Sequence, residues 1–234
     1  MNLLVSEDDV KEVTRLRGYK FLCHQRRKKA IIELISKTSP VGSTILDVGC
    51  ASGDIALELS LHGYSVHGID FESDKVFRAK DLANKYKKKI LFENKSFEEL
   101  DSQTSYDSVL LGEVLEHFID PANILKDISN LLKPNGRIFI STPNMPSLRN
   151  RLKFGLFGVF PDNNAEHKYY FDYTRISKVI AEAGYELISF KTCFTNLTAK
   201  SKSLAMIENI LLFWFPCLFK RSGDTIFAVI SPNS

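Results

Sequence analysis

The sequence is short of cysteine, of long hydrophobic runs and of charge of one sign, and each shortage excludes a class of protein. Its four cysteines among 234 residues form no CxxC pair and no Cys/His ligand spacing, which excludes a disulfide-stapled domain or a zinc finger and predicts reduced thiols. The most apolar run, residues 210–219, contains Pro216 and has about half the length that a membrane-spanning helix needs. A formal charge of +3, from 31 basic and 28 acidic residues, gives no indication of a nucleic-acid partner.

The remaining composition is that of an ordinary globular protein. Hydrophobic residues make up 44% of the chain and charged residues 25%, which is enough to bury one core. The first residues carry acids, at Glu7 to Asp9, where a signal peptide would have basic residues and then a long apolar run. We therefore expect one domain in a cytoplasmic protein, and the composition assigns no oligomeric state.

Short β-rich runs alternate with amphipathic runs along most of the chain. The alternation predicts βαβ units and an α/β fold with a largely parallel sheet. A helix after the fourth strand is well marked, because Asp120 is suited to cap it and Pro121 occupies its first position. Strands are expected at residues 44–48, 65–69, 90–93, 107–111, 137–141, 186–191 and 225–230, with a late helix at residues 174–183 closed by Gly184.

The turn after the first strand has the most informative residues. It reads Asp47-Val48-Gly49-Cys50-Ala51-Ser52-Gly53-Asp54, and its glycines permit backbone torsions that bring a chain close to a ligand at a helix N-terminus. Asp70 ends the next strand about 20 residues later, where an acid conventionally holds a ribose diol. The two features predict an adenosine-containing cofactor, with a tight connection that binds nothing as the alternative.

This turn departs from a dinucleotide fingerprint and resembles another family. Asp54 stands where G-x-G-x-x-G needs a third small residue, which disfavours NAD and FAD. Asp47, Gly49, Ala51 and Gly53 resemble motif I of the class I S-adenosylmethionine-dependent methyltransferases, with Ala51 in place of the usual middle glycine. The resemblance spans about residues 40–145, and part of it is similar to the O-methyltransferases of ubiquinone biosynthesis. It includes residues 96–100, 106–117 and 132–141.

The resemblance implies a Rossmann-like, seven-stranded sheet with helices on both faces, and S-adenosylmethionine as the cofactor. In the family, the methionine end lies over the motif I turn and the end of the fourth strand, and the adenine lies near the loop after the third. Ser96 stands where many relatives carry Asp, and plain core packing is the alternative role for Phe97. The implied cofactor-binding residues are Asp47, Gly49, Cys50, Ala51, Gly53, Asp70, Phe71, Ser96, Phe97, Leu111, Gly112 and Glu113.

Two histidines are candidates for a general base. Glu113 and His117 are four residues apart and share one face if the segment is helical, and the ordinary pKa of imidazole suits proton transfer near neutral pH. His167, with Phe171 after it, resembles a segment of methyltransferases that act on sugars, lipids and small molecules. Structural roles for both histidines remain the alternatives. No metal site is expected, because residues 113–117 do not form an HExxH motif.

The resemblance also divides the chain and suggests an acceptor. We expect a helical cap at residues 1–40, a cofactor-binding core at 41–145, an acceptor-pocket insertion at 146–173, and final helices and strands at 174–234. The expected reaction is O-methylation of a small-molecule, sugar or lipid-linked acceptor. Residues 204–221 either pack on the protein or contact a membrane surface, and Arg149, Arg151 and Lys153 either bind an acidic acceptor or are solvated.

Two other functions remain as alternatives. One is a noncatalytic binding subunit with a methyltransferase-like fold, which would keep the cofactor site and lack turnover. The other is an NAD-dependent oxidoreductase, which the Asp54 position and the lack of a suitably placed Tyr-x-x-x-Lys pair disfavour.

Overall fold

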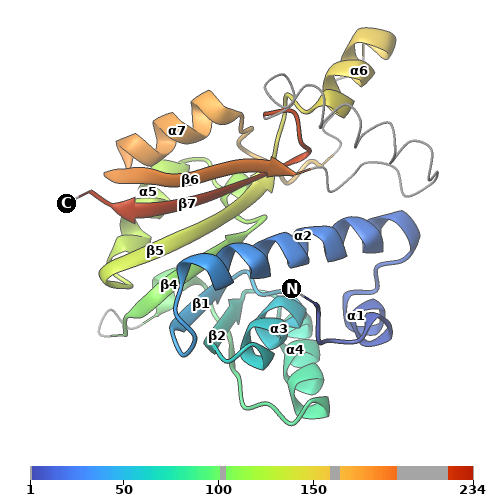
Figure 1. The fold of residues 1–234 in the computed structure, drawn as a ribbon, viewed down its shortest axis with the longest axis vertical. Helices are drawn as coiled ribbons and strands as arrows, with labels where there is room; N and C mark the ends of the chain where they lie inside the picture. Colours follow the sequence, from blue (N-terminus) through green and yellow to red (C-terminus); the bar gives the residue numbers. More distant parts are fainter. Residues whose placement is uncertain (1, 101–103, 159–163, 194–220, 234) are drawn as a thin grey trace.

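A computed structural model describes residues 2–100, 104–158, 164–193 and 221–233 (Figure 1). Its centre is one seven-stranded sheet with the order β3-β2-β1-β4-β5-β7-β6. The first five strands are parallel, and β7 runs antiparallel to both of its neighbours. The strands are β1 Thr44–Val48, β2 Ser65–Asp70, β3 Leu91–Asn94, β4 Tyr106–Gly112, β5 Leu132–Pro143, β6 Tyr185–Cys193 and β7 Thr225–Pro232.

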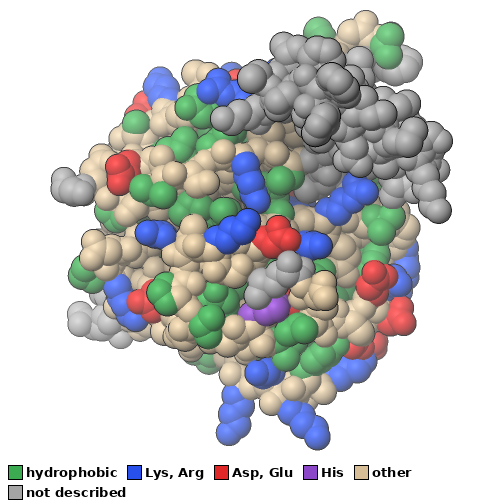
Figure 2. All heavy atoms as spheres, viewed as in Figure 1, with side chains coloured by type: hydrophobic (Ala, Val, Ile, Leu, Met, Phe, Trp, Pro, Cys, Tyr) green, Lys and Arg blue, Asp and Glu red, His purple; other side chains and the backbone are tan. Residues whose placement is uncertain are grey.

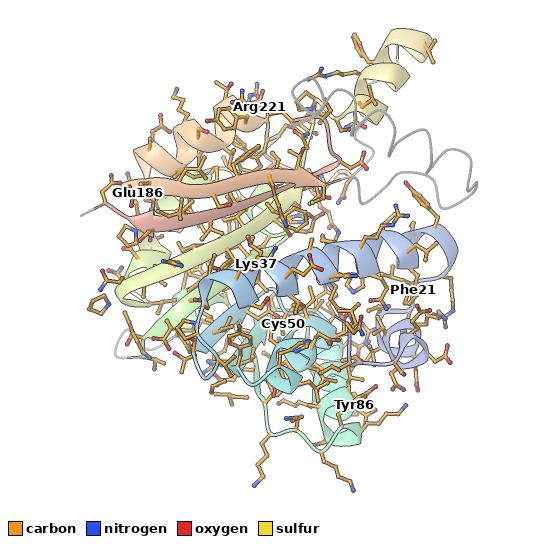
Figure 3. The ribbon with its side chains drawn as sticks, viewed as in Figure 1. Phe21, Lys37, Cys50, Tyr86, Glu186 and Arg221 are labelled. Carbon is orange, nitrogen blue, oxygen red and sulfur yellow. The ribbon has the colours of Figure 1, made fainter. Side chains whose placement is uncertain are left out.

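Helices cover both faces of this sheet. Three helices, α2 to α4, lie over one face with α1 packed against them, and α5 and α7 lie over the other face, while α6 projects beyond one end of the sheet (Figure 1). Side chains fill the space between the sheet and both helical layers (Figure 3). The helices are α1 Glu7–Thr14, α2 Gly18–Thr38, α3 Asp54–Leu61, α4 Ser73–Lys85, α5 Pro121–Ser129, α6 Leu148–Phe157 and α7 Tyr173–Glu182, with the short turns η1 Phe97–Glu99 and η2 Leu115–His117.

Alternation along the central strands explains the two layers. In β1, Leu46 and Val48 pack in the cluster beneath α5 and α7, whereas Ile45 packs beneath α2 and α3. A strand that is buried on both faces has apolar residues at successive positions, and β1 shows this except at Asp47, which is itself buried. The expected α/β class and Rossmann-like sheet are therefore confirmed.

The expected strands and the cap of α5 are present, with shifted boundaries. The Asp120 carboxylate accepts the backbone N–H of Asn123 at 3.1 Å, as a capping residue should. The turn expected at residues 134–136 instead interrupts the pairing near the start of β5, where Asn135 has φ of 63°. Helix α6 was not predicted, because residues 148–157 lack an apolar periodicity.

The face of the molecule drawn in Figure 2 has no single dominant character. On the face drawn in Figure 2, Lys and Arg side chains are interspersed with acidic and hydrophobic ones. Among the described helices, none combines the length and apolar composition needed to cross a bilayer. Most of the apolar segment expected at residues 204–221 lies outside the described residues, so its two alternative roles stay predictions.

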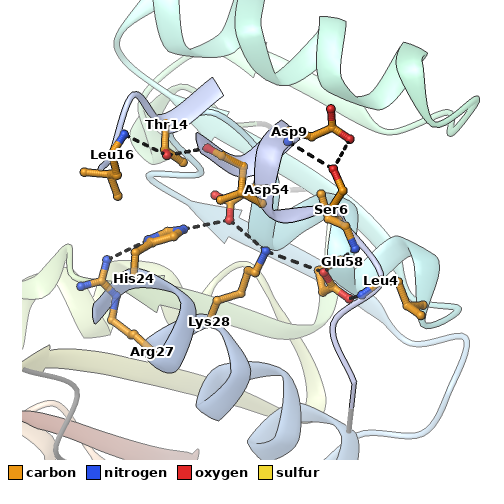
Figure 4. A network of polar contacts seen from close by, with 12 residues as sticks. Leu4, Ser6, Asp9, Thr14, Leu16, His24, Arg27, Lys28, Asp54 and Glu58 are labelled. Atoms are coloured by element: carbon orange, nitrogen blue, oxygen red, sulfur yellow. Dashed lines mark hydrogen bonds and ion pairs between the residues drawn. The ribbon is translucent and has the colours of Figure 1, made fainter. Parts of the chain in front are cut away.

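A buried group of charges ties the N-terminal helices to the core (Figure 4). The fully buried Lys28 of α2 has its Nζ 3.4 Å from Asp54 Oδ2 and 3.7 Å from Glu58 Oε2. Glu58 also accepts the backbone N–H groups of Leu4 and Val5. These contacts fix the N-terminal segment and α2 against α3, because an unpaired charge at any of these positions would be costly.

His24 completes this group from the preceding turn of α2. Its Nε2 lies 2.8 Å from Asp54 Oδ2. Burial alone raises the pKa of Asp54, but the charges and hydrogen bonds of His24 and Lys28 outweigh it and lower the pKa to about 2. Asp54 therefore stays ionised at neutral pH and faces α2.

Replacing Lys28 tests the contribution of these charges to folding. We expect Lys28→Ala to lower the free energy of unfolding by about 3–5 kcal/mol, because Asp54 and Glu58 would stay buried without their cation. Urea unfolding measures the change. Lys29→Ala, on the same helix but exposed, is the matched control and should change stability by less than about 0.5 kcal/mol. Equal effects of the two substitutions would contradict the assignment.

Candidate functional site

A cleft lies at the carboxyl ends of β1, β2 and β4. It has a volume of about 460 Å³ and adjoins a smaller apolar cavity of about 130 Å³. The two share four lining residues, Gly49, Asp70, Phe71 and His117, so they are parts of one hollow. Such a crevice, where crossovers leave a central strand in opposite directions, is where open α/β sheets bind ligands. The larger part is also lined by Ala51, Glu72, Lys75, Gly112, Glu113 and Glu166.

The turn between β1 and α3 needs small residues for its own packing. Gly49, Ala51 and Gly53 have φ of 70°, 47° and 73°, in the left-handed region that favours glycine. A Cβ on Gly49 would lie 2.6 Å from Val114 Cγ2, and one on Gly53 would lie 2.7 Å from Ala79 Cβ. Gly49 and Ala51 line the cleft, whereas Gly53 faces α4 and is not among the lining residues.

Asp70 joins this turn to the loop that follows β2. Its Oδ2 accepts the backbone N–H of Ala51 at 2.9 Å, and its Oδ1 accepts that of Glu72 at 2.9 Å. Each carboxylate oxygen has a further lone pair, and Asp70 lines both parts of the cleft. The side chain is thus held rigidly and can still accept hydroxyl groups. Phe71, 77% exposed, forms the adjoining rim.

The smaller cavity adjoins the loop after β3. Phe97 lines it and packs edge to face on Phe118, with ring centroids 6.2 Å apart. Phe97 also belongs to the core cluster, so it packs in the core as well as lining the cavity, and its contact with a cofactor stays a prediction. Ser96 instead forms a capping box with Glu99 at the start of η1 and is not a lining residue.

At the end of β4 the chain turns sharply toward the cleft. Glu113 has φ of 59° and donates its backbone N–H to Ser141 O at 2.8 Å. The premise that Glu113 and His117 share a helical face is therefore wrong, because only residues 115–117 form a short turn. Both residues nevertheless line the larger part of the cleft with Gly112, while Leu111 is buried beneath it.

Arg27 of α2 reaches this point from the other side of the chain. Its Nη1 lies 3.2 Å from Glu113 Oε2. The sequence showed only a basic run at residues 26–29, and nothing in that run distinguishes Arg27 from its neighbours. Its place beside the cleft depends on how α2 packs on α3.

The two candidate histidines come together beside a buried glutamate. The rings of His117 and His167 are 5.2 Å apart and nearly perpendicular. Backbone N–H groups of Lys168 and Tyr169 donate to Glu116 O at 2.9 and 3.0 Å, which holds the His167 segment against η2. Burial and the nearby Glu113 charge raise the pKa of Glu116 to about 8. Sequence reasoning assigned Glu116 no chemical role, since burial is not visible in the motif.

Three acidic or thiol side chains of the motif I region lie beneath the cleft. Asp47, 3% exposed, and Cys50, 5% exposed, are buried and do not line it. Burial raises the pKa of the Cys50 thiol. Asp54, which stands where a dinucleotide fingerprint needs a third small residue, is turned toward His24 and Lys28. Any contact of Asp47 or Cys50 with a cofactor stays a prediction.

Of the three basic residues considered for an acidic acceptor, Arg151 lies exposed on α6. The side chains of Arg149 and Lys153 are outside the described part of the structure.

Asp47 should make stability depend on pH. Burial, with the charges of Asp54 and Asp70, raises its pKa from 3.8 to about 8, so the native state keeps a proton that the unfolded chain releases. Wild-type stability should therefore fall as pH rises between these values, by at most about 1.4 kcal/mol per pH unit from this group. Asp47→Asn should remove this slope in urea unfolding, and exposed Asp81→Asn should keep it. Parallel pH profiles for wild type and Asp47→Asn would refute the shift.

Comparison with known proteins gives one consistent result. A family model described as a methyltransferase domain matches residues 22–190. A ubiquinone biosynthesis O-methyltransferase from Rickettsia prowazekii is 33% identical over 189 residues, covering 77% of this chain and 72% of that protein. One from Aeromonas salmonicida is 38% identical over 105 residues, 44% of each chain.

Solved structures have the same fold. The magnesium protoporphyrin IX methyltransferase of Synechocystis, with bound SAH, matches with a TM-score of 0.69 over 97% of this chain and 94% of its own, at 15% identity. The family model and the Rickettsia relative cover most of the chain, and the residues that the family model matches include the turn, Asp70 and the end of β4. The chain therefore belongs to the class I S-adenosylmethionine-dependent methyltransferases.

Proposed function

We propose that this methyltransferase uses S-adenosylmethionine to methylate a hydroxyl oxygen of a small-molecule, sugar or lipid-linked acceptor. The observation that carries the proposal is the cleft at the ends of β1, β2 and β4, where Asp70 and the motif I turn are joined by a hydrogen bond. The relatives named as ubiquinone biosynthesis O-methyltransferases support oxygen as the accepting atom.

The cofactor's parts fit different regions of this cleft. Asp70 accepts the ribose hydroxyls with the lone pairs that Ala51 and Glu72 leave unused. The adenine lies against Phe71 and Phe97 in the smaller, apolar cavity, and the methionine portion lies over Gly49, Gly112 and Glu113. The larger part alone has about 460 Å³, within the range of roughly 300–1,000 Å³ typical of small-molecule sites.

Methyl transfer demands positioning more than acid catalysis. A sulfonium leaves as a neutral thioether, so the departing sulfur needs no proton. Holding the acceptor oxygen in line with the S–CH3 bond supplies about 7–11 kcal/mol of the barrier reduction. The acceptor's proton must still be removed, and His117, which lines the cleft with His167 packed against its ring, is the candidate general base.

The acceptor occupies the side of the cleft formed by the segment around Glu166 and His167. Glu166 lines the cleft, and the same segment is fixed to η2 by the two bonds to Glu116 O. This placement supports the role expected for residues 146–173 in forming an acceptor pocket. A lipid-linked acceptor would agree with an apolar segment at residues 204–221.

Calorimetric titration with S-adenosylmethionine, S-adenosylhomocysteine and NAD tests the cofactor. Saturable binding of the first two, without NAD, is expected. Incubation with methyl-labelled cofactor and a panel of hydroxylated aromatic, sugar and prenylated acceptors then separates an enzyme from a binding subunit. Binding without transfer to any acceptor would favour the noncatalytic alternative, and binding of NAD alone would overturn the proposal.

Asp70→Ala tests the ribose contact. The substitution should weaken S-adenosylhomocysteine binding by about 1–3 kcal/mol, because the hydroxyls lose a charged acceptor and the turn loses its tie to β2. Calorimetry measures the affinity, and circular dichroism checks that the variant is folded. Asp74→Ala, at the exposed start of α4, is the matched control and should bind as wild type. Unchanged affinity in Asp70→Ala would refute the assignment.

A further inference from the structure

We infer that His24 of α2 is a positioning residue for cofactor binding, which acts through Arg27 on Glu113 at the edge of the cleft. The inference rests on the proposed function, because Glu113 lies where the methionine portion of S-adenosylmethionine would bind. His24 is buried and is not among the residues that line the cleft. Any effect of His24 on the cofactor must therefore pass through another side chain.

The two ring nitrogens of His24 face groups of opposite charge (Figure 4). Nε2 lies 2.8 Å from Asp54 Oδ2, and Nδ1 lies 3.4 Å from Arg27 Nη2. A guanidinium group has hydrogen-bond donors only, so Nδ1 must accept in the second contact. The ring proton then lies on Nε2, where it is donated to the ionised carboxylate of Asp54. A single tautomer of His24 thus satisfies both neighbours and joins them.

Arg27 uses both terminal nitrogens of its guanidinium group. Nη2 contacts His24, and Nη1 lies 3.2 Å from Glu113 Oε2. Because the guanidinium is planar, a hydrogen bond that holds one of these nitrogens also sets the direction of the other. The side chains of Arg27 and Glu113 are 26% and 23% exposed, and an ion pair that water reaches contributes little by itself. The contact with His24 supplies the restraint that this pair would otherwise lack.

His24 is in turn fixed from beneath. Asp54, which accepts from His24, also lies 3.4 Å from Nζ of the fully buried Lys28. Asp54 is the first residue of α3 and directly follows the motif I turn. A chain of contacts therefore runs from the motif I turn through His24 and Arg27 to the end of β4, and it joins two segments that both line the cleft.

Glu113 is the point at which this chain of contacts reaches the cleft. Its Oε2 is paired with Arg27, whereas its Oε1 is buried and has no hydrogen-bond partner among the described residues. Buried carboxylate oxygens are ordinarily paired, and the ammonium group of the methionine portion is a donor of the right charge. By fixing Oε2, Arg27 holds Oε1 in one direction. A group that is already oriented binds more tightly, because less side-chain freedom is lost on binding.

A purely structural role for His24 is the alternative. The ring would then only satisfy Asp54 and hold α2 on α3, and its contact with Arg27 would have no effect on the cleft. The two roles use different ring nitrogens, so substitutions can separate them. The amide nitrogen of glutamine can take the place of Nε2, and the amide oxygen of asparagine can take the place of Nδ1.

Two substitutions of His24 test the inference in the full chain. His24→Gln keeps a donor for Asp54 and loses the contact with Arg27, so calorimetry should show S-adenosylhomocysteine binding weakened by about fivefold or more. His24→Asn keeps an acceptor for Arg27 and loses the donor to Asp54. It should recover most of the affinity that His24→Gln loses, although urea unfolding should show it to be the less stable of the two. Lys29→Gln, exposed on the same helix, is the matched control and should change neither property.

A double substitution shows whether the effect passes through Arg27. Arg27→Ala should weaken S-adenosylhomocysteine binding at least as much as His24→Gln, and combining the two should cause little further loss, because the contact is already absent. Fully additive losses would contradict the inference. If His24→Gln does not fold, Arg27→Lys decides the matter, since it keeps a charge beside Glu113 but cannot contact both residues. It should weaken binding, and wild-type affinity in this variant overturns the inference.

The outcomes separate this inference from the proposed function. Wild-type binding of S-adenosylhomocysteine that folded His24→Gln leaves unchanged overturns the inference alone. Equal losses of affinity in His24→Gln and His24→Asn also overturn it, because they would indicate a structural role for the ring. Wild-type protein that binds no S-adenosylhomocysteine contradicts the proposed function and the inference together.

Discussion

The position of β1 between β2 and β4 is the constraint on which the site depends. The chain leaves β1 toward β2 and β3 on one side, then crosses back to form β4 on the other. Because all three strands are parallel, the turns that follow them meet at one edge of the sheet. The connections that leave these strands diverge there, and neither of them fills the crevice between them. Gly49, Asp70 and Glu113 meet there although each belongs to a different turn.

A second constraint acts from beneath this crevice. Lys28, Asp54 and Glu58 hold α2 on α3 through charges that are excluded from water, and α2 in turn brings Arg27 to Glu113. The first residue of α3 is Asp54, so the helix that begins at the motif I turn is also the helix that anchors the N-terminal layer. Packing of the N-terminal helices and the electrostatics of the cleft are therefore coupled.

The features that sequence predicts well are those encoded in local pattern. Strand positions follow from apolar runs, and Gly49 and Asp70 follow from their spacing, because a βα turn and the next strand end have fixed geometry. Local pattern does not predict the position of Arg27 beside the cleft, the surroundings of Glu116 or the inward direction of the Asp54 side chain. Each of these depends on which helix packs above the residue. The interpretation of Glu113 and His117 as sharing a helical face was wrong, because Glu113 has a positive φ and ends the regular structure there.

The strand order has a consequence for synthesis. Although β7 is the last of the described strands along the chain, it lies between β5 and β6, and β6 pairs with no other described strand. As the polypeptide leaves the ribosome, the first five strands can assemble in order, but β6 has no edge to join until residues 225–232 have emerged. Until then β5 would present an open edge in the nascent chain, and such edges are prone to pair with other chains. Completion of the sheet therefore waits for β7, which covers the edge of β5 and supplies the edge that β6 joins.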